Sequence, residues 1–413
     1  VGSQPQARCH GNMTLFRCVY QAKQALFMED IAVDTFLASS FGTFMMALFP
    51  GVLSAPSWHN VTSLASGWSL ACGRQTITTS LWSSGAAQVK HVSRYDAFVG
   101  GALSQRRSQR WARVLRCGAS LVPADAVIDV RLDEATMHKT GRHIPGAAYS
   151  RNGAGTARQE YRTLWGINLV WAIMRIPLQR WPGHALSLPV GLELSRKETL
   201  ATTRKGPYRS RSALARRIVD QVAATLPTRA MRVATDGGYA TQAFVRALPS
   251  NVDVVGRCFR TATRSQLPPP RVKGQRGAPR KKGAVIGSPT TVATPSPAWH
   301  PPPQEAGAVI QSWVGLWHSV FPGRPRRIVV VWRPHRADST QPPSTKACGR
   351  LKPLEAFFST DVSLSAHTIV ETYADRWAME IALRDGHTSY GRAQDHCRTC
   401  EHIVGANTLR FLL

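Results

Sequence analysis

The sequence predicts a mixed α/β fold in which a helical N-terminal region precedes a mixed β-sheet with helices. Apolar residues recur at helical spacing through residues 25–47 and 80–122, which is typical of helices that bury one face. After residue 122 the pattern changes to short runs rich in β-branched and aromatic residues, first clustered and then alternating with helical segments. Clustered strands followed by strand–helix alternation favour a mixed sheet.

Individual elements follow from these patterns. Strands are predicted over residues 126–132, 164–176, 186–194, 231–235 and 252–259, and helices over residues 210–226 and 239–248. The first strand is expected to end at Asp133 and the fourth at Asp236. In the helix 210–226, Leu214, Ile218 and Val222 fall on one face and should point inward.

The charge balance indicates a polyanionic partner. Lys and Arg total 52 against 24 Asp and Glu, which gives a net charge of +28 over 413 residues and an isoelectric point near 10.9. A field of this sign attracts DNA or RNA; the alternative is a basic surface that only aids solubility. We expect no membrane partner, because Gly42, Pro50 and Gly51 interrupt the uncharged stretch 35–58, which favours a buried helix and turn.

The cysteines and the chain start carry weaker signals. Eight cysteines without a framework, and no evident signal peptide, predict reduced thiols in a cytosolic protein. The first residue is Val, so we expect either a missing start or translation from Met13. The run His396-Cys397-x2-Cys400-x-His402 is too tightly spaced for an ordinary zinc finger, which favours incidental thiols over a zinc site.

Two basic clusters are candidates for phosphate contacts. Five arginines lie at helical spacing and suit either phosphates or solvent: Arg106, Arg107, Arg110, Arg113 and Arg116. Residues 266–305 are rich in Pro and Gly, which predicts a linker or an extended arm that orders only on nucleic acid. Its first part contains Arg271, Lys273, Arg276, Arg280, Lys281 and Lys282.

Carboxylates at strand ends are the candidates for chemistry. Phosphoryl transfer in nucleic acid needs two divalent metal ions, and Mg²⁺ prefers carboxylate oxygens. In a chain this poor in acids, Asp133 and Asp236 stand at predicted strand ends, and Gly237 and Gly238 allow close approach of the backbone. Taken singly, each Asp is better explained as a turn former or a helix cap.

A last helix, over residues 365–385, presents a polar face. Tyr373, Arg376, Glu380 and His387 fall within an arc of roughly 60° at ~100° per residue. A separate apolar stripe, expected to pack on the sheet, comprises Val370, Ala374, Trp377 and Ile381. The polar face suits metal binding by Glu380 and phosphate binding by Arg376, although a surface ion pair between these two residues explains the spacing equally well.

These motifs resemble a known family. Tyr373-x2-Arg376-x3-Glu380-x6-His387 resembles the YREK signature of bacterial insertion-sequence transposases, cut-and-paste enzymes with a retroviral-integrase (ribonuclease H-like) core. The resemblance covers most of residues 55–410, and its blocks occur in order. Further blocks are Leu132-Asp133-Glu134-Ala135-Thr136 with Lys139-Thr-Gly141-Arg-His143, Asp236-Gly-Gly-Tyr239-Ala, residues 266–281, Phe357-Phe358-Ser359-Thr360-Asp361 and His91-x2-Arg94-Tyr95-x2-Phe98.

The resemblance implies a DDE-type DNA transposase that cleaves and joins strands of an insertion element. Asp133, Asp236 and Glu380 would bind two Mg²⁺ or Mn²⁺ ions per active site. The partners implied are terminal inverted repeats and target DNA, with a homodimer in the synaptic complex, in the bacterial cytoplasm near the nucleoid. Such enzymes often cleave through a DNA hairpin with an aromatic residue on a flipped base; Trp313, Trp317 and Trp332 are candidates, although core packing explains each better.

The implied architecture is a ribonuclease H-like mixed sheet with a β-rich insertion subdomain and an N-terminal helical domain. The expected divisions are a helical DNA-binding region (1–122), the first part of the core (123–265), a basic linker or arm (266–306), the insertion with strands in 308–334 (307–350) and the last part of the core (351–413).

Three departures from the family pattern leave alternatives open. His387 stands where the family has Lys, Ala135 replaces a small hydroxyl residue, and the chain ends at Leu413, close behind the last expected core segment. They favour, as an alternative, a catalytically impaired remnant that only binds DNA. A basic RNA-associated scaffold is a third hypothesis, and it predicts that the three carboxylates lie far apart.

Overall fold

The computed structural model describes twelve segments of the chain. They are residues 54–71, 76–101, 107–141, 143–151, 163–178, 183–198, 208–271, 273–274, 276–292, 309–332, 354–382 and 399–412. Predictions for residues 13–53, for His387 and for Cys397 therefore lie outside the described residues. No helix in the described segments is long and apolar enough to span a membrane.

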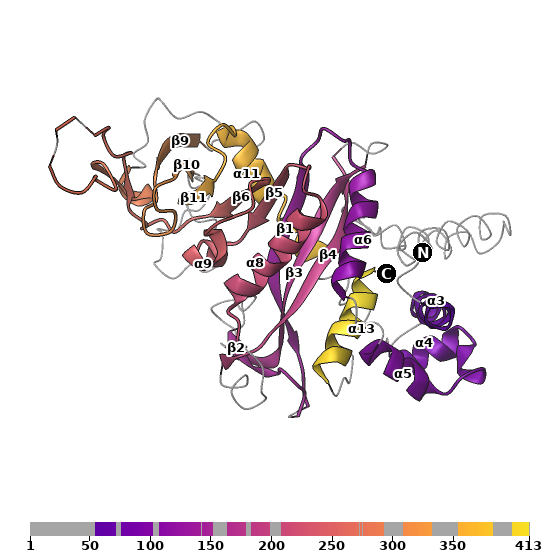
Figure 1. Ribbon diagram of the computed structural model, residues 1–413. Helices are drawn as coiled ribbons and strands as arrows, with labels where there is room; N and C mark the ends of the chain where they lie inside the picture. The colour runs from indigo at the N-terminus through magenta and orange to yellow at the C-terminus, as the bar shows by residue number, and fades with distance from the viewer. Residues whose placement is uncertain are drawn as a thin grey trace, which may run out of the picture.

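The described residues form one mixed sheet of eleven strands flanked by helices (Figure 1). The strands are β1 (Ile128–His138), β2 (Ala148–Arg151), β3 (Thr163–Pro177), β4 (Ala185–Ser195), β5 (Met231–Thr235), β6 (Val252–Arg257), β7 (Arg264–Ser265), β8 (Val285–Gly287), β9 (Val309–Leu316), β10 (Pro325–Trp332) and β11 (Leu354–Ser359). Their order is β2-β3-β1-β5-β6-β11-β10-β9-β7-β8, and β4 pairs with β3.

The part β4-β3-β1-β5-β6 has the arrangement of a ribonuclease H-like core. β1 pairs antiparallel with β3, and β3 with β4, whereas β1, β5 and β6 run parallel. This mixed α/β sheet confirms the predicted fold class. Beyond β6, the antiparallel strands β11, β10 and β9 continue the same sheet, so the strands expected in residues 308–334 form β9 and β10.

The helices cover the sheet and form a separate group near the N-terminal end. They are α3 (Ala55–Leu70), α4 (Ile77–Ser83), η1 (Ala86–Gln88), α5 (Val92–Gly100), α6 (Arg107–Ser120), α8 (Arg211–Thr225), η2 (Gly237–Tyr239), α9 (Gln242–Val245), α10 (Pro289–Val292), α11 (Ala366–Ala374) and α13 (Cys400–Leu412). α6 and α8 pack on β3 and β4 (Figure 1). α13 contacts both β4 and α5, so it joins the N-terminal helices to the core.

Local chemistry explains the element that carries most of this packing. Ser210 caps α8 by accepting a hydrogen bond from the Ala213 N–H, as an N-cap residue should. Leu214, Ile218 and Val222 are buried under 6% exposure, which confirms the predicted inward face. At Gly191 of β4, a Cβ atom would lie 2.6 Å from Ile218, so the glycine lets α8 approach the sheet closely.

Two predicted elements differ in extent. β1 continues to His138 instead of ending at Leu132, because β3 pairs with it along Glu134–His138. The helix expected over residues 239–248 is replaced by the short η2 and α9. Arg246 is extended, with a ψ of 128°, and Ala247 follows with a φ of 51° in the left-handed region, so α9 ends at Val245.

Candidate active site

The register between β1 and β5 sets two acids side by side. The last parallel pair joins Leu132 to Thr235, and Asp133 and Asp236 are the next residues on the two strands. Asp236 caps η2, and its carboxylate accepts a hydrogen bond of 2.6 Å from the Gly237 N–H. The prediction that Asp133 ends its strand was wrong, because Asp133 lies within β1 opposite Trp171 of β3; it does stand where the parallel pairing ends.

Asp133 lies in a partly dehydrated, negatively charged environment. Its side chain is 16% exposed. Burial raises the pKa of Asp133 to about 6, although Arg376 and the Glu134 N–H favour the ionised form. Asp236 and Glu380 raise this pKa further by repulsion, so each of these two acids lies within electrostatic range of Asp133.

The helix that carries Glu380 is broken next to the site. The prediction of one helix over residues 365–385 was wrong: α11 ends at Ala374, residues 375–376 form a turn, and residues 377–382 are helical again. Backbone bonds from Ala378 N–H to Asp375 O and from Met379 N–H to Arg376 O tighten this turn. The turn changes which side chains face inward, and the predicted apolar stripe is therefore wrong at Trp377, which is 61% exposed, whereas Met379 is fully buried.

Two ion-pair groups attach this turn to the sheet. Asp375 lies 3.3 Å from Arg175 of β3 and 3.9 Å from Arg131 of β1, which is 1% exposed. Arg376, the next residue, binds the Asp133 carboxylate and also lies 2.9 Å from Glu380. Asp129, Arg131 and Asp133 share one face of β1 by strand alternation. The turn is thus held to a charged row along one strand.

Arg376 and Tyr373 form the cationic side of the site. Burial opposes the charge of Arg376, but Asp133 and Glu380 hold its pKa above the ordinary value. The Arg376 guanidinium lies 5.5 Å from the ring centre of Tyr373, which packs on Phe357 at 4.7 Å. Burial raises the pKa of Tyr373, so its hydroxyl stays protonated near neutral pH. The ion pair between Arg376 and Glu380, expected at the surface, is part-buried and includes Asp133.

The donor set fits hard divalent cations. Carboxylate oxygens of Asp133, Asp236 and Glu380 are the ligands that Mg²⁺ prefers. Within the described segments, no three acidic, His or Cys side chains are close enough together to ligate an ion as they stand. The Arg376 guanidinium lies between the carboxylates of Asp133 and Glu380. Both carboxylates favour the charged form of Arg376.

A neighbouring group was not predicted from the sequence. The Arg211 guanidinium binds the carboxylate of Glu134, which follows Asp133 in β1. Tyr239 is buried next to Glu134, Asp133 and Asp236, and burial followed by these acids raises its pKa well above the ordinary value. The available signal was Glu134 itself, a second acid directly after Asp133 in a chain poor in acids.

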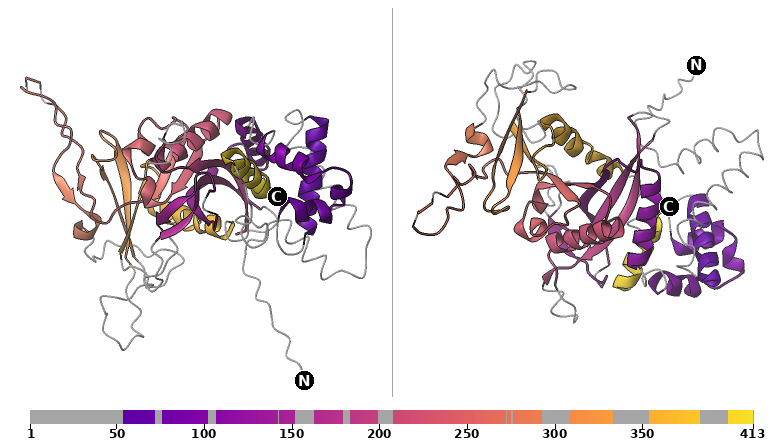
Figure 2. Two further views of the ribbon diagram at one scale, coloured as in Figure 1. Left: turned by 90° about the horizontal axis from the view of Figure 1, so that it is seen from below. Right: turned by 45° about the horizontal axis from the view of Figure 1, so that its top comes forward.

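The other predicted contact residues have different environments. All six basic arm residues are exposed: Arg271, Lys273, Arg276, Arg280, Lys281 and Lys282. They lie between β7 and β8 in a two-stranded arm that projects from the sheet (Figure 2). Of the five arginines predicted to face phosphates or solvent, Arg110 is 1% exposed, so the prediction was wrong there. Arg107 pairs with Glu193 at 3.0 Å, and Arg106 lies outside the described residues.

The candidate tryptophans and His402 take part in structural contacts. Trp317 is 2% exposed, and the guanidinium of Arg264 lies 3.9 Å from its ring centre, which confirms the core interpretation for this residue. Trp313 and Trp332 also pack against the core. Both ring nitrogens of His402 have partners, Thr399 at 2.8 Å and the Asp96 carbonyl at 2.9 Å. His402 is therefore engaged in structural contacts.

Two family models match the chain. One is described as a transposase DDE domain and matches residues 207–413; the other is described as a DDE superfamily endonuclease and matches residues 70–308. Each covers half of the chain or more, and together with the sheet topology they define the class as a DDE transposase or nuclease. The chain belongs to the DDE superfamily of transposases and endonucleases. A comparison with curated proteins found no match.

Proposed function

We propose that this protein is the transposase of a bacterial insertion sequence, of the group with a YREK signature. The observation that carries the proposal is that Asp236 and Glu380, acids from distant parts of the chain, both lie close enough to Asp133 to raise its pKa, and that Arg376 pairs with Asp133 and Glu380. Tyr373, Arg376 and Glu380 supply the first three signature positions, and His387 the fourth.

We infer that Asp133, Asp236 and Glu380 hold two Mg²⁺ or Mn²⁺ ions. Bound metal ions would activate the attacking oxygen and stabilise the leaving oxygen. In the ion-free protein, Arg376 pairs with Asp133 and Glu380. When metal ions neutralise these acids, Arg376 would bind a DNA phosphate, because its planar guanidinium matches phosphate oxygens. Tyr373 keeps its proton and can donate a hydrogen bond to the same strand.

The partners proposed are terminal inverted repeats and target DNA. The net charge of +28 and the exposed basic residues of the arm support a DNA partner. A homodimer would bring two element ends into one synaptic complex, because both ends must be cut for the element to move. The proposed location is the bacterial cytoplasm at the nucleoid, and the expected domain divisions stay predictions.

The first prediction is metal-dependent nicking. In Mg²⁺ or Mn²⁺, the protein should nick a labelled DNA fragment that carries the ends flanking its gene. Asp236→Ala should lower the nicking rate at least a hundredfold, because an acid of the proposed triad is lost. Asp220→Ala is the control, since Asp220 is a surface acid paired with Arg216 on α8.

The outcomes separate the proposal from its alternative. Nicking that survives Asp236→Ala would refute the catalytic assignment. Salt-sensitive binding without nicking in either metal would favour the impaired remnant, for which the histidine at position 387 in place of Lys is the motivating feature. If the control Asp220→Ala neither binds nor nicks DNA, its fold is damaged. The comparison is then repeated with Asp220→Asn as the control.

A further inference from the structure

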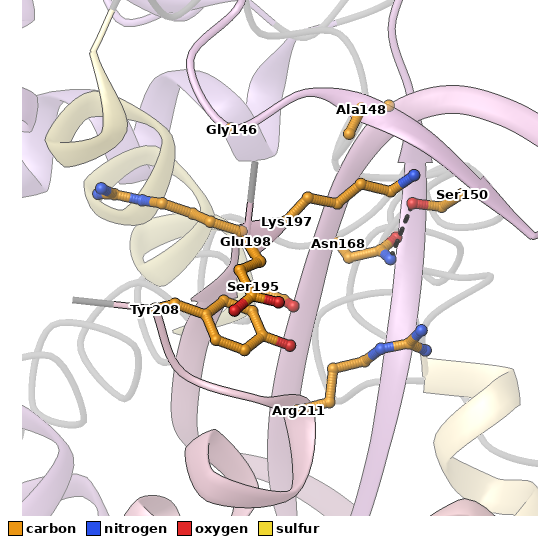
Figure 3. Close-up of a pocket in the computed structure, with 11 residues that line it drawn as sticks. Gly146, Ala148, Ser150, Asn168, Ser195, Lys197, Glu198, Tyr208 and Arg211 are labelled. Atoms are coloured by element: carbon orange, nitrogen blue, oxygen red, sulfur yellow. Dashed lines mark hydrogen bonds between the residues drawn. The ribbon is translucent and has the colours of Figure 1, made fainter. Parts of the chain in front are cut away.

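A polar pocket lies beside the candidate active site, at the start of α8 and the adjoining ends of β2, β3 and β4. Its volume is about 280 Å³, and its lining includes Ser150, Asn168, Lys197, Tyr208 and Arg211 (Figure 3). This volume is near the lower end of the range for ligand sites, roughly 300–1,000 Å³. The pocket is therefore large enough for one small polar group and too small for a duplex.

The lining suits a phosphate. Arg196 and Lys197 contribute two cations against one acid, Glu198, and the third cation of the lining, Arg211, is paired with Glu134. In Figure 3, the Lys197 amino group lies near Ser150 and Asn168, which bond to each other at 3.1 Å. The N-terminus of α8, which begins at Arg211, adds the positive end of a helix dipole.

Tyr208 gives the pocket an aromatic wall. It is 46% exposed and lines the pocket together with Ser195 and Glu198 (Figure 3). Tyr208 is also close enough to Arg211 to affect its pKa. An exposed aromatic ring beside cations is the combination that binds nucleotides, because every base can stack on a ring while the cations bind the phosphate.

Arg211 connects the pocket to the candidate active site. The same guanidinium that lines the pocket binds Glu134, the neighbour of Asp133 in β1. Beyond Leu132, β1 has lost its parallel partner β5 while it remains paired to β3, so its other edge is free of β5 next to Asp236. Asp133 and Glu134 point to opposite faces of β1, so a DNA strand that crosses this edge can contact the acids on one face and the Arg211 side on the other.

We propose that this pocket binds one unpaired nucleotide of the DNA strand that lies in the active site. Lys197 binds its phosphate, and Tyr208 stacks on its base. The proposal rests on the proposed function, because the DNA strand is the ligand. An unpaired nucleotide fits better than a paired one, since both the phosphate and the face of the base must be accessible at once.

The test uses the full chain and two single-residue variants. Tyr208→Ala should weaken binding of a fluorescein-labelled single-stranded oligothymidylate roughly tenfold, the effect of losing a stacked base. Tyr149→Ala is the matched control: Tyr149 is 62% exposed and points to the opposite face of β2 from Ser150. This control should change affinity less than twofold.

Lys197→Ala should make the slope of log affinity against log salt less steep by about 0.7, the value for one phosphate contact on a single strand. Lys197→Arg should restore it. A 5-iodouracil oligonucleotide should crosslink to Tyr208 on irradiation, and Lys197→Ala should lower the yield of this adduct. Arg324→Ala removes one positive charge from the exposed turn between β9 and β10 and should leave the adduct unchanged.

Each outcome decides one question. If the protein binds and nicks DNA but Tyr208→Ala and Lys197→Ala match the wild type and no adduct forms at Tyr208, the pocket proposal is overturned while the transposase proposal stands. If the wild-type protein binds no DNA at all, the transposase proposal fails first. Weaker binding in the two pocket variants with an adduct at Tyr208 supports the proposal.

Discussion

Asp133 carries a conflict that is typical of functional carboxylates. Its strand position removes it from water, which opposes ionisation, yet binding of a cation requires the ionised form. Arg376 relieves part of the conflict in the ion-free protein, and Asp236 and Glu380 add to it. Above its pKa, the ionised Asp133 carboxylate destabilises the ion-free site. This fits a residue whose charge is used to bind a ligand.

The second prediction concerns the pH dependence of stability. The pKa of Asp133 is raised from 3.8 to about 6, so between these values the folded protein binds more protons than the unfolded chain. The free energy of unfolding therefore falls as pH rises through this interval. Asp133→Asn cannot titrate, and its stability relative to the wild type should increase by roughly 2 kcal/mol from pH 4.5 to pH 7.5.

Urea unfolding in EDTA at both pH values measures this difference. The comparison between pH values cancels any constant effect of the substitution on packing. A difference between variant and wild type that stays the same at pH 4.5 and pH 7.5 would show that Asp133 ionises as it does in water. Addition of Mg²⁺ at pH 7.5 should stabilise the wild type more than Asp133→Asn.

At the scale of elements, sequence periodicity predicted the regular ones. The strands 164–176, 186–194 and 231–235 and the helix 210–226 correspond to β3, β4, β5 and α8 within one residue at each end. These elements have continuous apolar runs or a clear amphipathic face, so local pattern and tertiary burial agree. The predicted strand end at Asp236 was right, whereas Asp133 lies inside β1 at the point where its parallel pairing with β5 ends.

The sequence did not predict the elements whose form depends on partners. β1 is longer than its apolar run because β3 supplies hydrogen bonds to residues 134–138. The break at residues 375–376 depends on Arg131, Arg175 and Asp133, which lie about 200 residues or more away in the chain. A helical wheel assumes constant rotation, and it therefore assigned Trp377 to the wrong face.

The third prediction tests this break as a positioning device. Asp375→Asn removes the charge that binds Arg131 and Arg175, so the turn that carries Arg376 and Glu380 should shift. We expect the turnover rate of nicking to fall roughly tenfold, since misplacement by about 1 Å has a large cost in catalysis. DNA affinity should stay within twofold, because Asp375 itself carries negative charge and contacts no proposed DNA ligand.

Asp220→Asn is the matched control, an Asp in a surface pair 2.7 Å from Arg216. The free energy of unfolding of Asp375→Asn should fall by about 1 kcal/mol, because Arg131 keeps Asp129 as a partner. Equal losses of nicking in the two variants, or none in either, would exclude a positioning role for Asp375.

At the scale of the whole molecule, the sheet separates two tasks. The strands β4-β3-β1-β5-β6 position Asp133 and Asp236. The continuation of the sheet through β11, β10 and β9 carries the exposed basic arm between β7 and β8 (Figures 1 and 2). The arm joins this continuation through the pair of Ser265 with Leu316. A basic arm on a rigid sheet suits contacts to the DNA backbone at a distance from the acids.

The last prediction concerns the salt dependence of duplex binding. Each phosphate contact contributes a slope of about −0.9 to a plot of log affinity against log salt. Replacement of the six arm residues by Gln should make the slope less steep by several units, up to about 5 if all six bind phosphates. An arm in which Arg and Lys are exchanged for each other keeps its charge and should keep the slope. A slope that is unchanged in the Gln variant would place the phosphate contacts elsewhere on the basic surface, because these side chains are exposed and their loss leaves the core intact.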